Sequence, residues 1–161
     1  MISVKGYAAQ SKMHPLAPFN FNRREPGEND VSIEITYCGV CHSDLHMVRD
    51  EWGGSIYPLV PGHEIVGRIQ SVGSKVKKFK AGDPAGVGVF VDSCRECAQC
   101  KAGLQQYCEA GMIGTYSNYE RDGKSITYGG YSSKIVVDAA YVYSLKFKSS
   151  FESMAAKAAK H

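Results

Sequence analysis

The chain has 161 residues, which is enough for one domain with a buried core of its own. Its 43% hydrophobic and 22% charged residues exclude a disordered chain, and its longest apolar runs are far shorter than the ~18 residues that a membrane-spanning helix needs. The formal charge of +3 comes from 19 basic and 16 acidic residues that are interspersed, which is too weak and too dispersed to argue for nucleic-acid binding.

Two short strands are predicted in the first part of the chain. The segment 2–9 reads as a strand and is followed by two prolines, which interrupt regular structure. A turn rich in proline, glycine and asparagine then precedes the segment 31–38, in which hydrophobic residues occupy every second position. This period of two indicates a strand that is buried on one face.

The second strand leads into a segment dense in reactive groups, Gly39-Val40-Cys41-His42-Ser43-Asp44-Leu45-His46. One thiol, two imidazoles, a hydroxyl and a carboxylate fall within six residues, and such groups bind metals and move protons. The same residues also fit a simpler interpretation, in which polar side chains cap a short helix and Cys41 is a small buried residue. Taken alone, the segment does not decide between the two interpretations.

A second candidate site follows in Pro61-Gly62-His63-Glu64, between a glycine turn and another predicted strand. A histidine in this place either faces a cavity or is a hydrogen-bonded turn residue. Because the thiol of Cys41 lies upstream, His63 is a candidate second metal ligand. Short strands separated by glycine turns continue to residue 91, and this pattern is typical of an all-β barrel or sandwich. The lysines of 75–80 fit a solvated turn.

Four of the six cysteines form the cluster Cys94-x2-Cys97-x2-Cys100, closed by Cys108. Four thiolates at this spacing can surround one zinc ion, and such a site is structural because no position is left for water. An iron–sulfur cluster stays open as an alternative, although its bacterial form continues with x3-C-P and seven residues separate the last two cysteines here. Disulfides or free thiols are another alternative. Disulfides need an oxidising compartment, and since no secretory signal is seen we expect reduced cysteines and a cytoplasmic protein.

The last part of the chain predicts more short strands and then a change of character. A polar hairpin tip is expected at 120–124 and strands over 132–137 and 141–145. From residue 149 a capping-box pattern and an alanine- and lysine-rich run predict a short helical tail over 149–161.

Five motifs, in this order, resemble those of zinc-dependent medium-chain alcohol dehydrogenases, most closely the cinnamyl-alcohol-dehydrogenase-like group. They are GVCHSDLH at 39–46, Trp52, PGHEIVG at 61–67, the four-cysteine cluster and GGYS at 129–132. The resemblance implies the N-terminal catalytic part of such an enzyme: a mainly β, GroES-like barrel with short helices over 1–148, and a zinc-binding lobe at roughly 92–112.

The resemblance also implies two zinc sites. Cys41 and His63 match ligands of a catalytic zinc that is held together with a further cysteine, and Glu64 matches a carboxylate that can approach this metal. Asp44 matches the acid that holds the zinc histidine, a contact that fixes the tautomer of the ring. The four-cysteine cluster matches the structural zinc site, with the ligands Cys94, Cys97, Cys100 and Cys108.

The remaining matched residues have implied roles around the catalytic zinc. Ser43 and His46 match the hydroxyl and the imidazole that pass the alcohol proton to solvent. His42 matches a position beside the cofactor pyrophosphate, and Trp52 matches a wall of the substrate pocket.

Three departures from the family pattern change what we expect. No G-x-G-x-x-G turn is present, so the Rossmann domain that would hold the dinucleotide is expected to be absent from this chain. No cysteine follows Leu145, where the family approaches its third ligand, and the chain-terminal His161 is a weak substitute, so occupancy of the catalytic zinc site is in doubt. Pro84 removes a hydrogen-bond donor, which predicts a strand that starts late or lies at an edge.

These features predict the catalytic-domain part of an alcohol dehydrogenase, which interconverts a small alcohol and an aldehyde by hydride transfer with NADP or NAD and is inactive as this chain alone. Neither nucleic acid nor a membrane is an expected partner, and a homodimer is an open expectation. The alternative is a non-enzymatic zinc-binding or interaction module that retains the fold. A co-chaperonin-like subunit, suggested by fold type only, is a weaker alternative because fold does not imply function.

Overall fold

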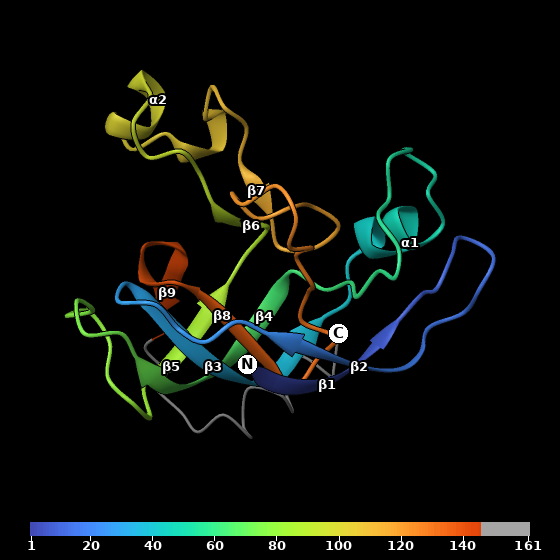
Figure 1. Cartoon of the computed structure of the whole chain (residues 1–161), viewed down its shortest axis with the longest axis horizontal. Helices are drawn as coiled ribbons and strands as arrows, with labels where there is room; N and C mark the ends of the chain where they lie inside the picture. Colours follow the sequence, from blue (N-terminus) through green and yellow to red (C-terminus); the bar gives the residue numbers. More distant parts are fainter. Residues whose placement is uncertain (146–161) are drawn as a thin grey trace.

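A curled five-stranded antiparallel sheet forms the centre of the structure (Figure 1), with the strand order β8-β3-β4-β5-β9. The computed structural model describes residues 1–145, so the predicted tail over 149–161 and His161 lie outside the described residues. Two smaller antiparallel pairs, β1-β2 and β6-β7, accompany the sheet. This arrangement confirms the prediction of a mainly β fold with a few short helices.

The strands are short, as the sequence pattern predicted, and turns or single helical turns connect them. The sheet strands are β3 (Asp30–Gly39), β4 (Glu64–Val72), β5 (Pro84–Val87), β8 (Lys134–Asp138) and β9 (Val142–Ser144). The outer pairs are β1 (Ile2–Ala8) with β2 (Ala17–Arg23), and β6 (Phe90–Asp92) with β7 (Ile113–Gly114). The helices are α1 (His42–Val48), α2 (Ala98–Lys101), and the 3-10 turns η1 (Gln105–Tyr107) and η2 (Ala139–Tyr141).

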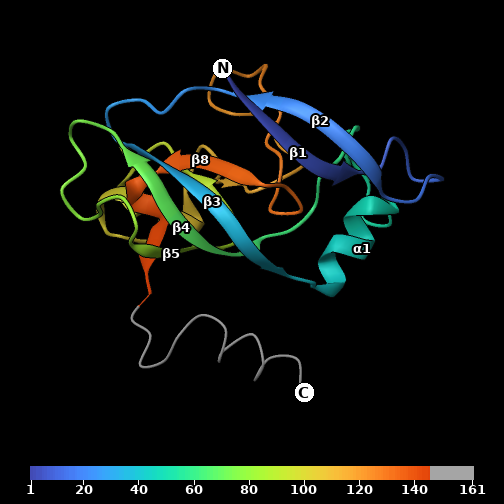
Figure 2. The same cartoon turned by 90° about the horizontal axis from the view of Figure 1, so that it is seen from below.

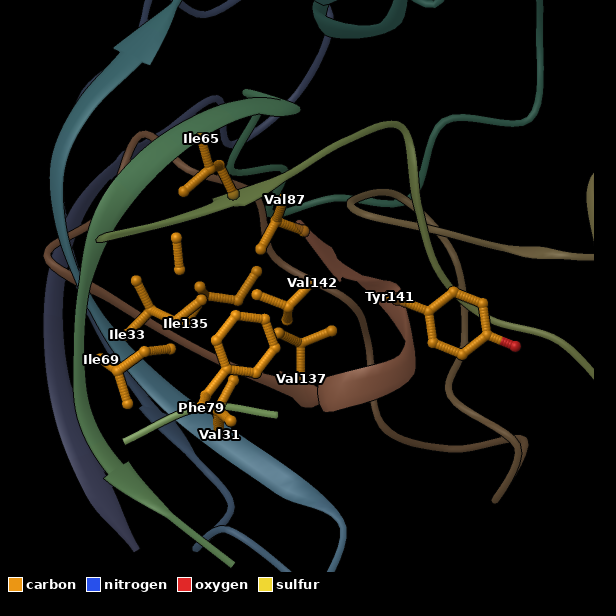
Figure 3. Close-up of a cluster of buried hydrophobic side chains, with 11 residues drawn as sticks. Val31, Ile33, Ile65, Ile69, Phe79, Val87, Ile135, Val137, Tyr141 and Val142 are labelled. Carbon is orange, nitrogen blue, oxygen red and sulfur yellow. The ribbon is translucent and has the colours of Figure 1, made fainter. Parts of the chain in front are cut away.

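The hydrophobic core lies inside the curl of the central sheet (Figure 3). Side chains from five strands meet there, and each fully buried aliphatic side chain contributes about 1.5–3 kcal/mol relative to an exposed one. Val31 and Ile33 are completely buried as predicted, but Ser32 between them is buried as well, at 4% exposed, and Tyr37 is 43% exposed, so the predicted alternation holds only in part. The far end of β3 therefore leaves the core, and this is the end that leads to α1.

The strand that begins at Pro84 differs in part from our prediction. It does start at the proline, but the edge position was wrong, because β5 lies between β4 and β9. A proline in the first position of a strand removes only one backbone donor from the hydrogen-bond ladder. The residue before it still takes part in the pairing, because the Asp83 carbonyl accepts the Ile69 amide at 2.9 Å.

The pairing of β3 with β4 brings two distant segments to the same end of the sheet. Gly39, the last residue of β3, is opposite Glu64, the first residue of β4. Consequently Cys41, just after β3, and His63, just before β4, lie on the same side of the molecule. Figure 2 shows α1 continuing from β3 at this end of the sheet.

A half-buried guanidinium fastens the hairpin β1-β2 to the loop before β8. Arg23 Nε donates to the Lys134 carbonyl at 2.7 Å, and Nη2 donates to the Tyr128 carbonyl at 2.7 Å and the Gly129 carbonyl at 3.2 Å. Burial lowers the pKa of Arg23 to about 10, so the group is still charged at neutral pH. Charge-assisted bonds of this kind hold the 128–134 loop in place.

A buried carboxylate at the start of β3 makes the stability of the fold depend on pH. Burial by itself would raise the pKa of Asp30, but the Arg24 guanidinium and the Gly27 amide, which donates at 2.6 Å, lower it overall. A carboxyl whose pKa is lowered in the folded state stabilises the fold above its unfolded pKa and loses this contribution as pH falls.

We predict that Asp30→Asn lowers the free energy of unfolding by about 1–3 kcal/mol at neutral pH, because the ionised acceptor of two donors is lost. The difference from the unmodified chain should shrink as pH falls below about 4, where the carboxyl of the unfolded chain becomes protonated, and should vanish only below the lowered pKa of the folded state. Urea unfolding across pH checks this. Glu28→Gln, which breaks the exposed ion pair with Lys75, is the control and should change stability little. A deficit that stays constant down to acidic pH would contradict the prediction.

Candidate metal centres

The four-cysteine cluster lies on a lobe that projects away from the central sheet (Figure 1). The strands β6 and β7 form its base, and α2 and η1 lie between them in sequence. Cys97 is the N-cap of α2, where its sulfur accepts the Cys100 amide at 3.4 Å. Arg95 ties the lobe to the sheet, since it donates to Asp138 of β8 at 2.9 Å and to Asp92 at 2.7 Å.

The four sulfur atoms converge on one point. All lie within 4.8 Å of one another, and the sulfurs of Cys94 and Cys100 are 3.9 Å apart. A tetrahedral zinc with bonds of about 2.3 Å places its sulfurs about 3.8 Å apart. The set therefore fits a single tetrahedral ion, and it is too tight for a four-iron cluster, whose cysteines lie at the outer corners of a cube. All six cysteines are free thiols in the structure.

Backbone amides favour the thiolate form of three of these cysteines. The pKa values of Cys94, Cys97 and Cys108 are lowered, in each case most strongly by a backbone N–H, such as the Cys94 amide that donates to Cys108 Sγ at 3.3 Å. The fourth differs. The hydrogen bond with Ser93 lowers the pKa of Cys100, but burial and the Cys97 sulfur outweigh it, so that the pKa is raised to about 11.

A second group of metal-ligating side chains lies at the end of the sheet where β3 and β4 meet. Ligand atoms of Cys41, His63 and Glu64 are all within 4.8 Å of one another. Cys41 is the N-cap of α1, and His63 is buried. The Glu64 side chain folds over Gly39, where a Cβ would collide with its carboxylate. The predicted ligands Cys41 and His63 are thus brought together, with Glu64 beside them, although their binding of zinc stays a prediction.

The carboxylate of Asp44 lies beneath this group and is only 3% exposed. Its Oδ2 accepts the Cys41 amide at 3.0 Å, and its Oδ1 accepts the Gly62 amide at 3.1 Å. Oδ1 is also 3.5 Å from Nδ1 of His63. Asp44 therefore links the start of α1 to the segment before β4 and lies beside the ring of the candidate metal ligand, while its role in holding a zinc histidine stays a prediction.

Two tyrosines next to Asp44 were not identified from the sequence. The Tyr131 hydroxyl donates to Asp44 Oδ2 at 3.1 Å. Tyr116 stacks on the His63 ring, with centroids 5.8 Å apart, and its hydroxyl also hydrogen-bonds Asp44. Burial first, and then the Asp44 charge, raise the pKa of both tyrosines well above the usual value, so both hydroxyls remain donors. In the sequence Tyr131 appeared only within the GGYS motif, whose two glycines allow the close approach seen here: a Cβ at Gly129 would be 2.4 Å from the Pro61 carbonyl oxygen.

The other predicted site residues lie along α1 and the turn after it. The Ser43 hydroxyl donates to Cys41 Sγ at 3.0 Å, which places it at the candidate metal site. The His46 ring is 4.8 Å from that of His42 and stacks on Trp52 at 4.7 Å. Trp52 is 62% exposed, so it covers His46 on one side only. The relay, cofactor and pocket roles of these four residues stay predictions.

Glu51 fixes the orientation of His46. Its carboxylate is 2.5 Å from His46 Nδ1, and this hydrogen bond is the main cause of a lowered pKa of Glu51. The other ring nitrogen of His46 is consequently left for a different partner.

A cavity of about 850 Å³ opens beside the cleft. His63 and Glu64 form its polar wall, and the rest is mostly apolar, including Val87 and Tyr143. Cys38 also lines it, and burial raises the pKa of this thiol to about 11, so it is a protonated, apolar wall residue rather than a thiolate. The arrangement offers a metal site with an open side next to a hydrophobic space that can take a small organic molecule.

The structure thus combines a β-rich fold, a lobe in which four thiols converge, and a separate cleft in which a thiol, an imidazole and a carboxylate meet. No helix in the described part of the chain is long and apolar enough to cross a membrane. Comparisons with known proteins identify the family to which this arrangement belongs.

Residues 27–147 match the alcohol dehydrogenase GroES-like domain family. The chain is 53% identical over 145 residues to the aldehyde reductase YahK of Escherichia coli (strain K12), which is 90% of this chain and 41% of that protein. It is 55% identical over 141 residues to cinnamyl alcohol dehydrogenase 2 of Rauvolfia serpentina, and this match covers 88% of this chain and 39% of that protein. The solved structure of CAD from Helicobacter pylori complexed with NADP(H) superposes with a TM-score of 0.88 at 44% identity, covering 94% of this chain and 44% of that one.

The chain therefore belongs to the alcohol dehydrogenase GroES-like domain family, and the proteins it resembles include a cinnamyl alcohol dehydrogenase. It spans about 41% of the length of the curated relative from Escherichia coli.

A glycine with a positive φ angle positions the candidate ligand His63. Gly62 has a φ of 101°, and a Cβ there would be 2.6 Å from the Tyr131 ring and 2.7 Å from Cys38 Sγ. We predict that Gly62→Ala costs about 2–5 kcal/mol of unfolding free energy, from backbone strain plus overpacking. Gly82→Ala is the matched control, because Gly82 has a φ of 89° with open space around it, and should cost only the strain, about 1–2 kcal/mol. Equal losses in chemical denaturation would contradict the close packing at Gly62.

Proposed function

We propose that this chain is the catalytic-domain part of a zinc-dependent alcohol dehydrogenase, which interconverts an alcohol and an aldehyde by hydride transfer with a nicotinamide cofactor. The observation that carries the proposal is the presence of two different candidate metal centres in one fold: a closed set of four thiols and an open set of Cys41, His63 and Glu64. Relatives with 53–55% identity are named as an aldehyde reductase and a cinnamyl alcohol dehydrogenase.

In this proposal the lobe holds a structural zinc. Its ligands are the four sulfurs that fit one tetrahedral ion: Cys94, Cys97, Cys100 and Cys108. No position remains for substrate, so this ion only stabilises the lobe. The lobe has few buried hydrophobic residues other than its own cysteines and Ile113, which supports a fold that depends on the metal.

The cleft holds the catalytic metal in the same proposal. Cys41 and His63 bind it, and Asp44 keeps the ring of His63 oriented. Zinc, when bound, supplies a Lewis acid that lowers the pKa of an alcohol beside it. Glu64 lies close enough to complete the ligand set when no substrate is present. The apolar cavity next to this group takes the organic part of the substrate, although Trp52, the predicted wall of the substrate pocket, does not line it.

The residues of α1 handle the proton and the cofactor. Ser43 is at the Cys41 sulfur, where its oxygen would accept the alcohol proton while the hydroxyl gives up its own proton, and His46, held by Glu51 at the partly exposed side, would take that proton on to solvent. His42 is exposed on the first turn of α1, where it can face a cofactor phosphate. The nicotinamide cofactor itself carries the hydride, and this domain contributes only the residues that would lie on one side of it.

Three finer points are also part of the proposal. The domain is taken to extend over 1–148, because the composition changes at 149, and the segment 149–161 lies outside the described residues. A cytoplasmic location is supported by the six free thiols. Homodimer formation is open, and light scattering on the purified chain decides it.

A second candidate function is a non-enzymatic zinc-binding module that retains the fold. It is favoured by one observation: only Cys41, His63 and the exposed Glu64 gather at the cleft among the described residues, one thiolate fewer than the family resemblance implied. One zinc per chain favours this module, whereas two favour a surviving catalytic site. We expect little or no turnover of an aromatic aldehyde with NADPH by this chain alone, and robust turnover would contradict that expectation.

We predict that zinc content separates the two centres. Cys97→Ser should lose the tightly bound zinc and unfold the lobe, because one of four ligands is removed from a closed site. Cys41→Ser should barely change the zinc that copurifies, since the cleft offers a weaker ligand set. Cys38→Ser, a cysteine in neither group, is the control. Metal analysis together with thermal unfolding measures these effects, and equal zinc losses in Cys97→Ser and Cys41→Ser would refute the assignment.

A further inference from the structure

The two carboxylate oxygens of Asp44 face different parts of the candidate site. Oδ1 accepts the Gly62 amide at 3.1 Å and lies 3.5 Å from Nδ1 of His63. Oδ2 accepts the Cys41 amide at 3.0 Å and the Tyr131 hydroxyl at 3.1 Å, and the Tyr116 hydroxyl is a further donor to the same carboxylate. The orientation of this carboxylate about its last bond therefore decides whether an oxygen is available to the His63 ring.

Tyr131 reaches Asp44 from a segment that is 87 residues away in sequence. Three backbone hydrogen bonds hold its loop along the segment before β4: Gly129 N to Val60 O at 2.8 Å, Gly130 N to Gly62 O at 2.8 Å and Tyr131 N to Pro61 O at 2.9 Å. The Tyr131 ring also fills the space over Gly62. These backbone hydrogen bonds and the ring packing therefore fix the position of the Tyr131 hydroxyl.

Arg23 holds the same loop from its other side. Its guanidinium donates to the carbonyls of Tyr128 and Gly129 and, at 3.3 Å, to the Ser132 hydroxyl oxygen. The loop is consequently held between Arg23 and the segment before β4, with the Tyr131 hydroxyl at Asp44 Oδ2.

We propose that Tyr131 is a positioning residue for the cleft metal site. Its hydroxyl fixes the rotation of the Asp44 carboxylate, so that Oδ1 accepts Nδ1–H of His63 and the other ring nitrogen faces Cys41 and Glu64. This inference rests on the proposed function, in which Cys41 and His63 bind the metal. Without the hydroxyl, Oδ2 keeps the Cys41 amide but loses a side-chain donor in a buried place, and a buried acceptor that loses a partner rotates or admits water.

The substitution Tyr131→Phe separates the hydroxyl from the ring. Phenylalanine keeps the packing over Gly62 and the backbone bonds of the loop, so that only the bond to Asp44 is lost. Tyr128→Phe is the matched control on the same loop, since the Tyr128 ring packs on Phe21, with centroids 4.6 Å apart, and on Phe19. Any general effect of removing a tyrosine hydroxyl from this loop should occur in both variants.

The first measurement is the tautomer of His63, read from the ring nitrogens by NMR on the full chain loaded with one equivalent of zinc, at about pH 8 where a free histidine is neutral. We expect the Nδ1–H tautomer to dominate in the unmodified chain and in Tyr128→Phe. In Tyr131→Phe the ratio of tautomers should fall at least about threefold, because a carboxylate that rotates releases the Nδ1–H. A merely structural role of Tyr131 would lower the unfolding temperature without changing this ratio.

The second measurement is the affinity of the cleft for Co²⁺, added after the lobe is filled and followed by the thiolate absorption band. Tyr131→Phe should weaken this affinity by about tenfold, with Tyr128→Phe unchanged. If the unmodified chain binds no second ion, the proposed function fails for this chain, and the tautomer ratio alone decides the inference. An unchanged His63 tautomer ratio in Tyr131→Phe overturns the inference, whatever the metal content.

Discussion

The pairing of β3 with β4 is the constraint on which the cleft depends. Because Gly39 is opposite Glu64, the residues that follow one strand and precede the other share one end of the sheet, and Cys41 meets His63 across 22 positions of sequence. Glycine is needed at this crossing, since a Cβ at Gly39 would occupy the place of the Glu64 carboxylate. A shift of one residue in this register would turn Glu64 to the other face and separate the candidate ligands.

The two candidate metal centres differ in what holds them together. The lobe uses four cysteines within 15 consecutive positions, so its backbone amides and sulfurs form the site locally. The cleft uses residues from three separate segments and needs the folded sheet, the buried Asp44 and the loop held by Arg23. Local sites of the first kind couple metal binding to folding, whereas the second kind is preorganised by the protein around it.

The sequence was sufficient for the parts of the structure that depend on local patterns. Spacing alone indicated the four-thiol lobe, and alternation indicated β3, because both signals lie within a few residues. Long-range contacts could not be predicted from these local patterns. Neither periodicity nor composition shows that Tyr131 contacts Asp44, or that Tyr116 stacks on His63, since these depend on how distant segments pack. The position of β5 inside the sheet was missed for the same reason: an initial proline tells where a strand begins, not which neighbours it has.

X-ray absorption at the zinc edge, on the chain loaded with one and then two equivalents of zinc, tests the central claim that one fold holds a sealed sulfur site and an open mixed site. The account predicts four sulfur neighbours at about 2.3 Å for the first equivalent, and nitrogen or oxygen neighbours at about 2.0–2.1 Å appearing only with the second. Nitrogen ligands around the first equivalent, or sulfur-only coordination for both, would contradict it.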